Sequence, residues 1–304
     1  MHRVLGIVLT LISAIGFGTL AILGRYALAD GMNAPTILFL RFSLAALVML
    51  AWLALRRQPL PRGRTLLMLV GMGAIGYVGQ AFAYLTALQY ASSGLVALLL
   101  YLYPIFVAVL SVVLLHERFT PPKVAALGLA LGGIALTVGP AGGQLYGIVL
   151  AISAAAIYSV YIIVGARVMR DVTAVQSSAV IFASAGAMSG LIMATQGAQW
   201  PASSAGWAAI AGIVVLATLV PVVMFLAGLE RIGPTNAAML STLEPVVTVL
   251  LAVVLLGEVL QPVTLVGGGL ILVAVLLLTR SELRSSTRHA AVSAPMDEDE
   301  ELAQ

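Results

Sequence analysis

The stretch PIFVAVLSVVLLHERFTPPKVAALGLAL, residues 104–131, is matched without gaps by PVVTVLLAVVLLGEVLQPVTLVGGGLIL, residues 245–272. The offset is 141 residues. A shared apolar composition would explain the valines and leucines of this match, but it does not explain why other residue types fall in register. These are Pro104 with Pro245, Glu117 with Glu258, Pro121 with Pro262, and Gly128 with Gly269. The repeat indicates that the chain is built from two equivalent halves.

Ten apolar segments fill most of the 304-residue chain. About twenty apolar residues at ~1.5 Å per residue cross the ~30 Å hydrocarbon core of a bilayer, so each segment is about long enough for a transmembrane helix. The composition agrees, because 9% charged residues is far below the roughly 25% of soluble proteins. The sequence therefore predicts an all-α membrane protein of ten transmembrane helices. The segments lie approximately at residues 4–28, 34–55, 66–88, 93–115, 123–139, 145–166, 173–195, 206–229, 235–256 and 263–279.

Five predicted helices fall in residues 1–140 and five in residues 145–280. Five is odd, so the second half must enter the membrane with the opposite orientation to the first. Such inverted five-helix repeats are typical of secondary transporters, which bind substrate near the midplane between the halves and alternate its access to the two sides. Residues 281–304, which end in MDEDEELAQ, form a charged tail that the sequence predicts to be disordered in the cytoplasm.

The basic residues fall on alternate connections between the predicted helices. With the N-terminus placed inside, 13 of them lie on inner loops and termini and none on outer loops. Arg25 and Arg41 lie within predicted helices. By the positive-inside rule, this asymmetry predicts that both termini face the cytoplasm of a bacterial inner (plasma) membrane. The net charge of +3 is therefore a topology signal, and no nucleic-acid partner is expected.

The two repeated stretches and the predicted ten-helix arrangement resemble the EamA branch of the drug/metabolite transporter (DMT) superfamily. The likeness covers residues 4–280 and rests on residues 102–134, which begin LYPIF, on residues 243–272, which begin LEPVV, and on LRFSLAA at residues 40–46. The chain departs from the usual pattern at His116, where glycine is expected before Glu117. The resemblance implies an exporter of amino acids or related small metabolites, with YddG-type amino-acid exporters as related proteins.

Two charged residues within predicted helices are candidate substrate-binding residues. Glu244 lies about nine residues, ~14 Å, into its segment and so near the midplane, where an acid is costly and generally faces the bundle interior. It is predicted to exchange a proton, to bind a cation, or to serve only helix packing beside Pro245. Arg41 is the cationic counterpart, with a substrate carboxylate or Glu244 as its expected partner; a structural ion pair or snorkelling is the alternative.

Tyr77, Gln80 and Tyr84 are spaced i, i+3, i+7, so they share one helix face. The 141-residue offset maps this face onto Thr218, Pro221 and Phe225, and an inverted repeat would set both faces across one central cavity. Other polar residues extend the predicted lining, although the same residue types also hold transmembrane helices together. They are Tyr101, Tyr103, Tyr158, Tyr161, Ser241 and Thr242. Pro104, Pro221 and Pro245 interrupt helices and are predicted hinges, with static kinks as the alternative.

The sequence carries no enzyme signature, no cofactor motif and no metal-binding motif. The predicted function is therefore secondary active export of small metabolites, with aromatic or apolar amino acids favoured by the aromatic lining. The expected partners are the substrate and the lipid bilayer, with proton coupling as one alternative. A non-transporting sensor, or a protein that handles nucleotide sugars or lipids on the same scaffold, is the other class that the sequence leaves open.

Overall fold

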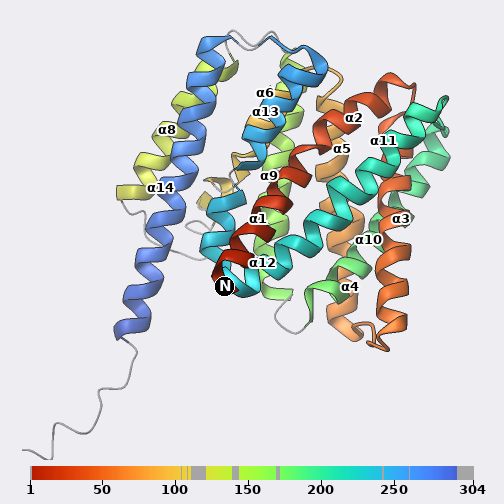
Figure 1. The fold of residues 1–304 in the computed structure, drawn as a ribbon, viewed down its shortest axis with the longest axis horizontal. Helices are drawn as coiled ribbons and strands as arrows, with labels where there is room; N and C mark the ends of the chain where they lie inside the picture. The colour runs from red at the N-terminus through yellow and green to blue at the C-terminus, as the bar shows by residue number, and fades with distance from the viewer. Residues whose placement is uncertain are drawn as a thin grey trace, which may run out of the picture.

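The protein is a bundle of helices (Figure 1). A computed structural model describes residues 2–103, 105–107, 109–110, 121–138, 144–168, 172–241, 243–259 and 261–292. Within these ranges the regular secondary structure is helical, without β-strands. In chain order the elements are α1 (His2–Gly18), α2 (Leu20–Ala29), α3 (Ala34–Leu55), α4 (Gly63–Gly71), η1 (Met72–Tyr77), α5 (Val78–Ala87), α6 (Ser93–Leu100), α8 (Pro121–Val138), α9 (Leu145–Val168), α10 (Ala174–Gln196), α11 (Ser204–Val214), η3 (Val215–Leu219), α12 (Val220–Ser241), α13 (Leu243–Leu256) and α14 (Pro262–Val292).

Six helical stretches of the described chain are long and apolar enough to cross a membrane. They are Val4–Ala29, Ala34–Leu55, Gly63–Ala87, Leu145–Gly165, Val175–Gln196 and Ser204–Phe225. Shorter apolar helices occupy the places of the other four predicted segments: Ser93–Val107, Val124–Gly133, Leu243–Leu256 and Pro262–Leu277. The all-α prediction is confirmed for the described residues, whereas the count of ten transmembrane helices stays a prediction.

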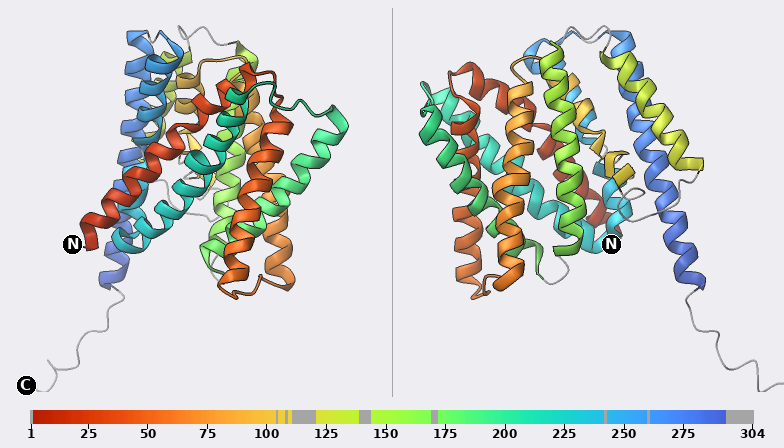
Figure 2. Two further views of the ribbon diagram at one scale, coloured as in Figure 1. Left: turned by 45° about the vertical axis from the view of Figure 1, so that its right-hand side comes forward. Right: turned by 180° about the vertical axis from the view of Figure 1, so that it is seen from behind.

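Helices of the first half pack against helices of the second half. α1 packs along α12, α3 along α10, α5 on α9, and α8 along α14. The two views of Figure 2 show the α8–α14 pair standing at one side of the bundle. The loop between α3 and α4, residues 56–62, lies at the bottom of Figure 1, and we call this the basic end. Residues 30–33 and 257–259 lie at the opposite end, which we call the Asp30 end.

Two helices contain a π-helical stretch at matching places. η1 covers Met72–Tyr77 and η3 covers Val215–Leu219, and the 141-residue offset moves the first onto residues 213–218. η3 ends two residues before Pro221, whose ring removes a backbone donor and clashes with the carbonyl four residues earlier. A π-helical turn is one way in which a helix accommodates such a defect, and it often marks a functional site.

The first helix approaches α13 closely through Gly18. A Cβ built at Gly18 would lie 2.8 Å from Val247 Cγ1 and 3.0 Å from the Glu244 carbonyl oxygen. Thr248 Oγ1 also donates to the Gly18 carbonyl at 2.9 Å. Glycine at this position therefore lets the backbone of α1 reach the start of α13, which brings Phe17 beside Glu244.

Helix boundaries differ from the predicted ones in the second half. The sequence predicts a loop between residues 229 and 235, but α12 continues to Ser241 and α13 begins at Leu243. Pro245 is then the third residue of α13, within the first turn, where a missing backbone donor costs little. Glu244 therefore lies at a helix start rather than in mid-helix.

At the C-terminal end, α14 continues past residue 280 to Val292, and disorder of the tail at residues 281–304 stays a prediction. Residues 281–292 contain neither proline nor glycine, so nothing in their composition stops the helix. Residues 293–304, Pro104 and Thr242 lie outside the described part of the chain, so the predictions made for them stay predictions.

Candidate functional site: a tyrosine-lined central cavity

A cavity of about 290 Å³ lies between the two halves of the chain. Its walls come from α1, η1, α9, α10, α12, the start of α13 and the residues that follow α6. The lining residues are Phe17, Tyr77, Tyr101, Tyr103, Tyr158, Tyr161, Ser177, Ser178, Ile181, Phe182, Val222, Phe225, Ser241 and Glu244. A smaller lobe of about 120 Å³ shares six of these residues and is lined in addition by Leu20, Arg41, Gln80, Ala81, Tyr84 and Leu100.

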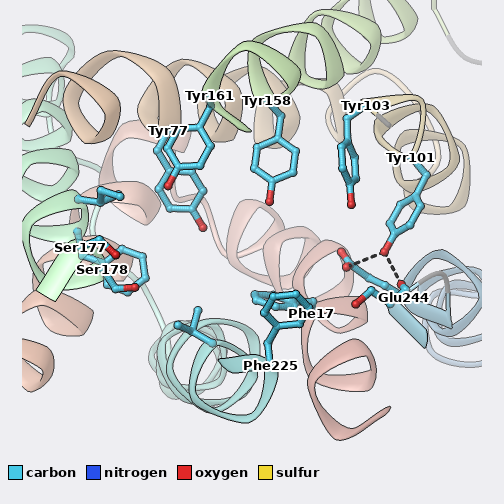
Figure 3. A pocket seen from close by; sticks show the side chains of 14 residues that line it. Phe17, Tyr77, Tyr101, Tyr103, Tyr158, Tyr161, Ser177, Ser178, Phe225 and Glu244 are labelled. Carbon is cyan, nitrogen blue, oxygen red and sulfur yellow. Dashed lines mark hydrogen bonds between the residues drawn. The ribbon is translucent and has the colours of Figure 1, made fainter. Parts of the chain in front are cut away.

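Five tyrosines form a continuous row along one wall (Figure 3). Ring centroids are 5.7 Å apart for Tyr77 and Tyr161, and 5.8 Å apart for Tyr161 and Tyr158. The row continues from Tyr158 to Tyr103 at 4.9 Å and from Tyr103 to Tyr101 at 5.7 Å. These spacings are those of favourable stacked and edge-to-face aromatic pairs. In Figure 3 several hydroxyl groups of the row point towards the side of the cavity that holds Phe17, Phe225 and Glu244.

Glu244 closes one end of the tyrosine row. The Tyr101 hydroxyl lies 3.0 Å from Glu244 Oε2 and also bonds to the Ser241 carbonyl. Tyr101 follows the last residue of α6, and Ser241 is the last residue of α12. One hydroxyl therefore connects the end of α6 to both sides of the break between α12 and α13, and it holds the carboxylate at the cavity surface.

Arg41 lies on α3 and is 4% exposed. Its Nε donates to Thr218 Oγ1 at 2.9 Å, and the Thr218 hydroxyl donates to the Ile213 carbonyl at 2.8 Å. Within the described residues, the Arg41 guanidinium and the Glu244 carboxylate face the same small lobe without forming an ion pair within 4.0 Å. The lobe thus presents one basic and one acidic group to whatever enters it.

The structure brings most of the predicted site residues together. Tyr77, Tyr101, Tyr103, Tyr158 and Glu244 line both parts of the cavity. Arg41, Gln80 and Tyr84 line the small lobe, and Ser241 lines the larger part. Thr218 is fully buried and reaches the cavity only through its bond to Arg41. Their role in substrate binding stays a prediction.

Two of the predicted hinges are described. Pro221 is the second residue of α12 and Pro245 the third of α13, so both lie in the first turn that follows a π-helical stretch or a break. The Pro221 carbonyl also accepts a 2.8 Å hydrogen bond from Ser13 Oγ of α1. Movement about these positions stays a prediction.

Nine lining residues were not predicted from the sequence: Phe17, Leu20, Ala81, Leu100, Ser177, Ser178, Ile181, Phe182 and Val222. The 141-residue offset is a signal that could have found some of them, because seven pairs of lining residues differ by this number. The pairs are Phe17 with Tyr158, Leu20 with Tyr161, Arg41 with Phe182, Ala81 with Val222, Tyr84 with Phe225, Leu100 with Ser241, and Tyr103 with Glu244. Equivalent positions of the two halves therefore face one cavity, with different side chains.

The described residues contain no cluster of three or more histidine, aspartate or glutamate side chains that could hold a metal ion. Helices long enough to cross a bilayer and a polar site enclosed among them define a polytopic membrane protein with an internal binding cavity.

Comparisons with known proteins agree with this class. The EamA-like transporter family matches the chain twice, over residues 4–139 and 145–280. An uncharacterized transporter of Archaeoglobus fulgidus is 29% identical over 271 residues, covering 88% of this chain and 94% of the relative. The uncharacterized transporter YcbK of Bacillus subtilis is 26% identical over 282 residues, covering 87% and 89%. A crystal structure with 22% sequence identity covers 90% of this chain and 98% of the other at a TM-score of 0.66, so it shares the fold.

The chain belongs to the EamA-like transporter family, and it is an integral membrane protein. The relatives carry the name of transporters, which agrees with the expectation of a function other than catalysis.

Proposed function

We propose that the protein is a secondary active transporter that exports small metabolites, and that aromatic or apolar amino acids are its favoured substrates. The observation that carries the proposal is the central cavity, whose walls come from equivalent positions of both halves. Its volume of about 290 Å³ is close to the lower limit of the roughly 300–1,000 Å³ of small-molecule sites. Aromatic walls with a few polar groups suit a small amphipathic solute.

The same proposal includes ten transmembrane helices in two inverted repeats that alternate access to the cavity. Three observations support it. Both matches to the family are 136 residues long and begin 141 residues apart. The π-helical stretches fall at matching places. The 141-residue offset relates the contact of α1 with α12 to the contact of α9 with α5. It exchanges α3 with α10 and α8 with α14, so the contacts α3–α10 and α8–α14 each map onto themselves.

The proposed location is a bacterial inner (plasma) membrane, with both termini in the cytoplasm. The support is the distribution of 13 basic residues on one set of loops, since cytoplasmic loops carry an excess of lysine and arginine.

Glu244 and Arg41 are the proposed polar contacts of the substrate. Glu244 would bind a substrate ammonium or exchange a proton, and Arg41 would bind a carboxylate. Arg41 suits this role because its described hydrogen bond uses only Nε, whereas a guanidinium has five N–H donors.

Uptake into proteoliposomes tests the proposal. A panel of radiolabelled amino acids is offered with and without a proton gradient, and we expect flux of at least one aromatic or apolar member. Glu244→Gln should abolish stimulation by the gradient if Glu244 carries a proton, and should lower affinity at every pH if Glu244 binds an ammonium group. Tyr146→Phe is the matched control, because Tyr146 is exposed and pairs with Tyr90 outside the cavity. Binding without flux for every solute would favour a sensor instead.

A further inference from the structure

A second polar cluster joins three helices at the Asp30 end. It consists of Arg25 on α2, Ser93 and Gly94 at the start of α6, and Glu258 just after α13, and we call it the clasp. None of these residues lines the central cavity. The clasp is therefore separate from the site described above.

Glu258 caps the N-terminus of α6. Its Oε1 accepts a hydrogen bond from the Ser93 backbone N–H at 2.8 Å, and its Oε2 accepts one from Gly94 N–H at 3.3 Å. The first backbone N–H groups of a helix have no partner within the helix, and a carboxylate there is also favoured by the helix dipole. The cap comes from a residue 165 positions further along the chain, so it ties the second half of the protein to the first.

The backbone around Gly257 directs Glu258 towards α6. Gly257 has a positive φ of 65°, a conformation that glycine adopts without the steric cost of a Cβ. The Glu258 N–H then donates to the Ala252 carbonyl at 3.1 Å. The reversal of the chain after α13 is thus what places the carboxylate over α6.

Arg25 on α2 completes the clasp. Its Nε donates to Ser93 Oγ at 3.2 Å and its Nη2 to the Ala91 carbonyl at 2.5 Å. Nη2 also lies 3.9 Å from Glu258 Oε1. Beside it, the Tyr26 hydroxyl donates to the Leu255 carbonyl at 3.2 Å. Hydrogen bonds in which one partner is charged are stronger than neutral ones, so the bonds of Arg25 and Glu258 help to hold α2, α6 and the end of α13 together at this end.

The same three elements line the cavity at their other ends. Leu20 begins α2, Leu100 ends α6 and Glu244 lies in the first turn of α13, and all three face the small lobe. Between the lobe and the clasp, α6 carries Val96 and Ala97 on the side nearest Leu100, and both are buried. The stretch of α6 between the small lobe and the clasp is therefore packed within the bundle on the side that faces the lobe.

Towards the basic end, the cavity lining reaches further. Ser177 and Ser178 of the larger cavity come from the first turns of α10. α10 begins towards the basic end, since it follows α9, which runs from the Asp30 end towards the basic end (Figure 1). The cavity lining thus extends towards the basic end, whereas towards the Asp30 end it stops short of the clasp.

We infer that the clasp is the gate of the Asp30 end: Glu258 holds α6 against α2 and α13 in this conformation, and its release opens the cavity to that side. The inference rests on the proposed transport function, because a gate serves a protein that moves a solute through the cavity. Its structural basis is the cap that joins the two halves over the buried part of α6. A two-state element of this kind shifts its populations when the contacts of one state are removed.

The test uses cysteine reporters, because the chain has no native cysteine. Ala97 is buried and lies on the face of α6 shared by Ser93 and Leu100, at spacings of four and three residues. Ala97→Cys is treated with a membrane-impermeant cationic thiol reagent applied at the Asp30 side of sealed proteoliposomes. No substrate is needed, so the outcome does not depend on whether the transport panel succeeds.

We expect Glu258→Ala to raise the labelling rate of Ala97→Cys by at least about tenfold, because two charge-assisted bonds of the closed state are lost. Glu258→Gln and Arg25→Gln, which each remove part of the clasp, should give smaller increases. Asp30→Asn is the matched control: Asp30 bonds to Ala202 N–H and Ser203 at the same end but makes no described contact with the clasp. It should leave the rate unchanged.

A second reporter separates gating from unfolding. Ala45→Cys is fully buried on α3, away from the clasp, and should stay unreactive in every variant. An unchanged rate at Ala97→Cys in Glu258→Ala would overturn the inference. Equal reactivity at both reporters would also overturn it, because the substitution would then loosen the whole bundle rather than one gate.

Discussion

Thr218→Val tests whether the Thr218 hydroxyl holds Arg41 in place at the cavity. Valine has nearly the shape of threonine but lacks the hydroxyl, and Thr218 is fully buried. The substitution removes the 2.9 Å bond from Arg41 Nε and the 2.8 Å bond to the Ile213 carbonyl. Arg41 would be left with an unpaired Nε beside an acidic group in the same lobe, so we expect its guanidinium to turn towards Glu244.

The magnitude follows from the kind of bond that is lost. A hydrogen bond to a charged group contributes about 1.5–3 kcal/mol in soluble proteins. Interhelical hydrogen bonds in a membrane protein average about 0.6 and reach about 1.7 kcal/mol. Because Arg41 is charged and buried, we expect the pair to lie at the upper end of the membrane range, about 1.5 kcal/mol. The Ile213 carbonyl adds about 1 kcal/mol to the effect of the single substitution.

The assay is equilibrium unfolding in mixed micelles, with a double-mutant cycle of Thr218→Val and Arg41→Met. Thr218→Ser keeps the hydroxyl and is the control, which should unfold close to the unsubstituted protein. A coupling free energy of about 1.5 kcal/mol between Thr218 and Arg41 is expected. Additive effects, within about 0.3 kcal/mol, would refute the bond as the element that positions Arg41.

The other predictions concern the cavity wall, a surface loop and the topology. Replacing Tyr77, Gln80 or Tyr84 by alanine should weaken transport in the liposome assay. Tyr77→Phe keeps the contacts of the ring with Phe42 and Tyr161, so this variant should keep most of the thermal stability. Normal flux in the alanine variants would mean that this helix face serves packing and not substrate binding. The Ser203 hydroxyl lowers the pKa of Asp30 below its ordinary value of 3.8, so the stabilisation of residues 202–206 by Asp30 is present above about pH 4 and is lost as pH falls through the lowered pKa. Hydrogen exchange at residues 202–206 should show this loss, and Asp30→Asn, which removes the charge, should show no comparable pH dependence. Single cysteines at residue 203 should be labelled from outside intact cells and cysteines at residue 60 should not; labelling of residue 60 from outside would reverse the proposed orientation.

The order of residues along the chain was sufficient to locate the apolar segments, because a helix that crosses a bilayer must be long and apolar wherever it lies in the bundle. It also identified Glu244 and Arg41, since a charge is rare in such a segment. The repeat offset mapped Tyr77, Gln80 and Tyr84 onto Thr218, Pro221 and Phe225; of these Phe225 lines the cavity, whereas Thr218 and Pro221 do not.

Helix ends were less predictable, because the start of α13 depends on where the chain can break beside Pro245 and not on hydrophobicity. The same holds for α14, whose continuation past residue 280 follows from local helix propensity rather than from the membrane.

The apolar spans, the asymmetry of basic loops and the two-fold repeat were thus determined by the sequence, because each is a property of residues read in order. Only the tertiary structure decided which side chains meet. The row of five tyrosines draws on three separate segments of the chain, Arg41 bonds to Thr218 across 177 residues, and Glu258 caps α6 across 165 residues. Such partners depend on how helix faces pack in three dimensions, and hydrophobic periodicity alone carries no information about which faces meet.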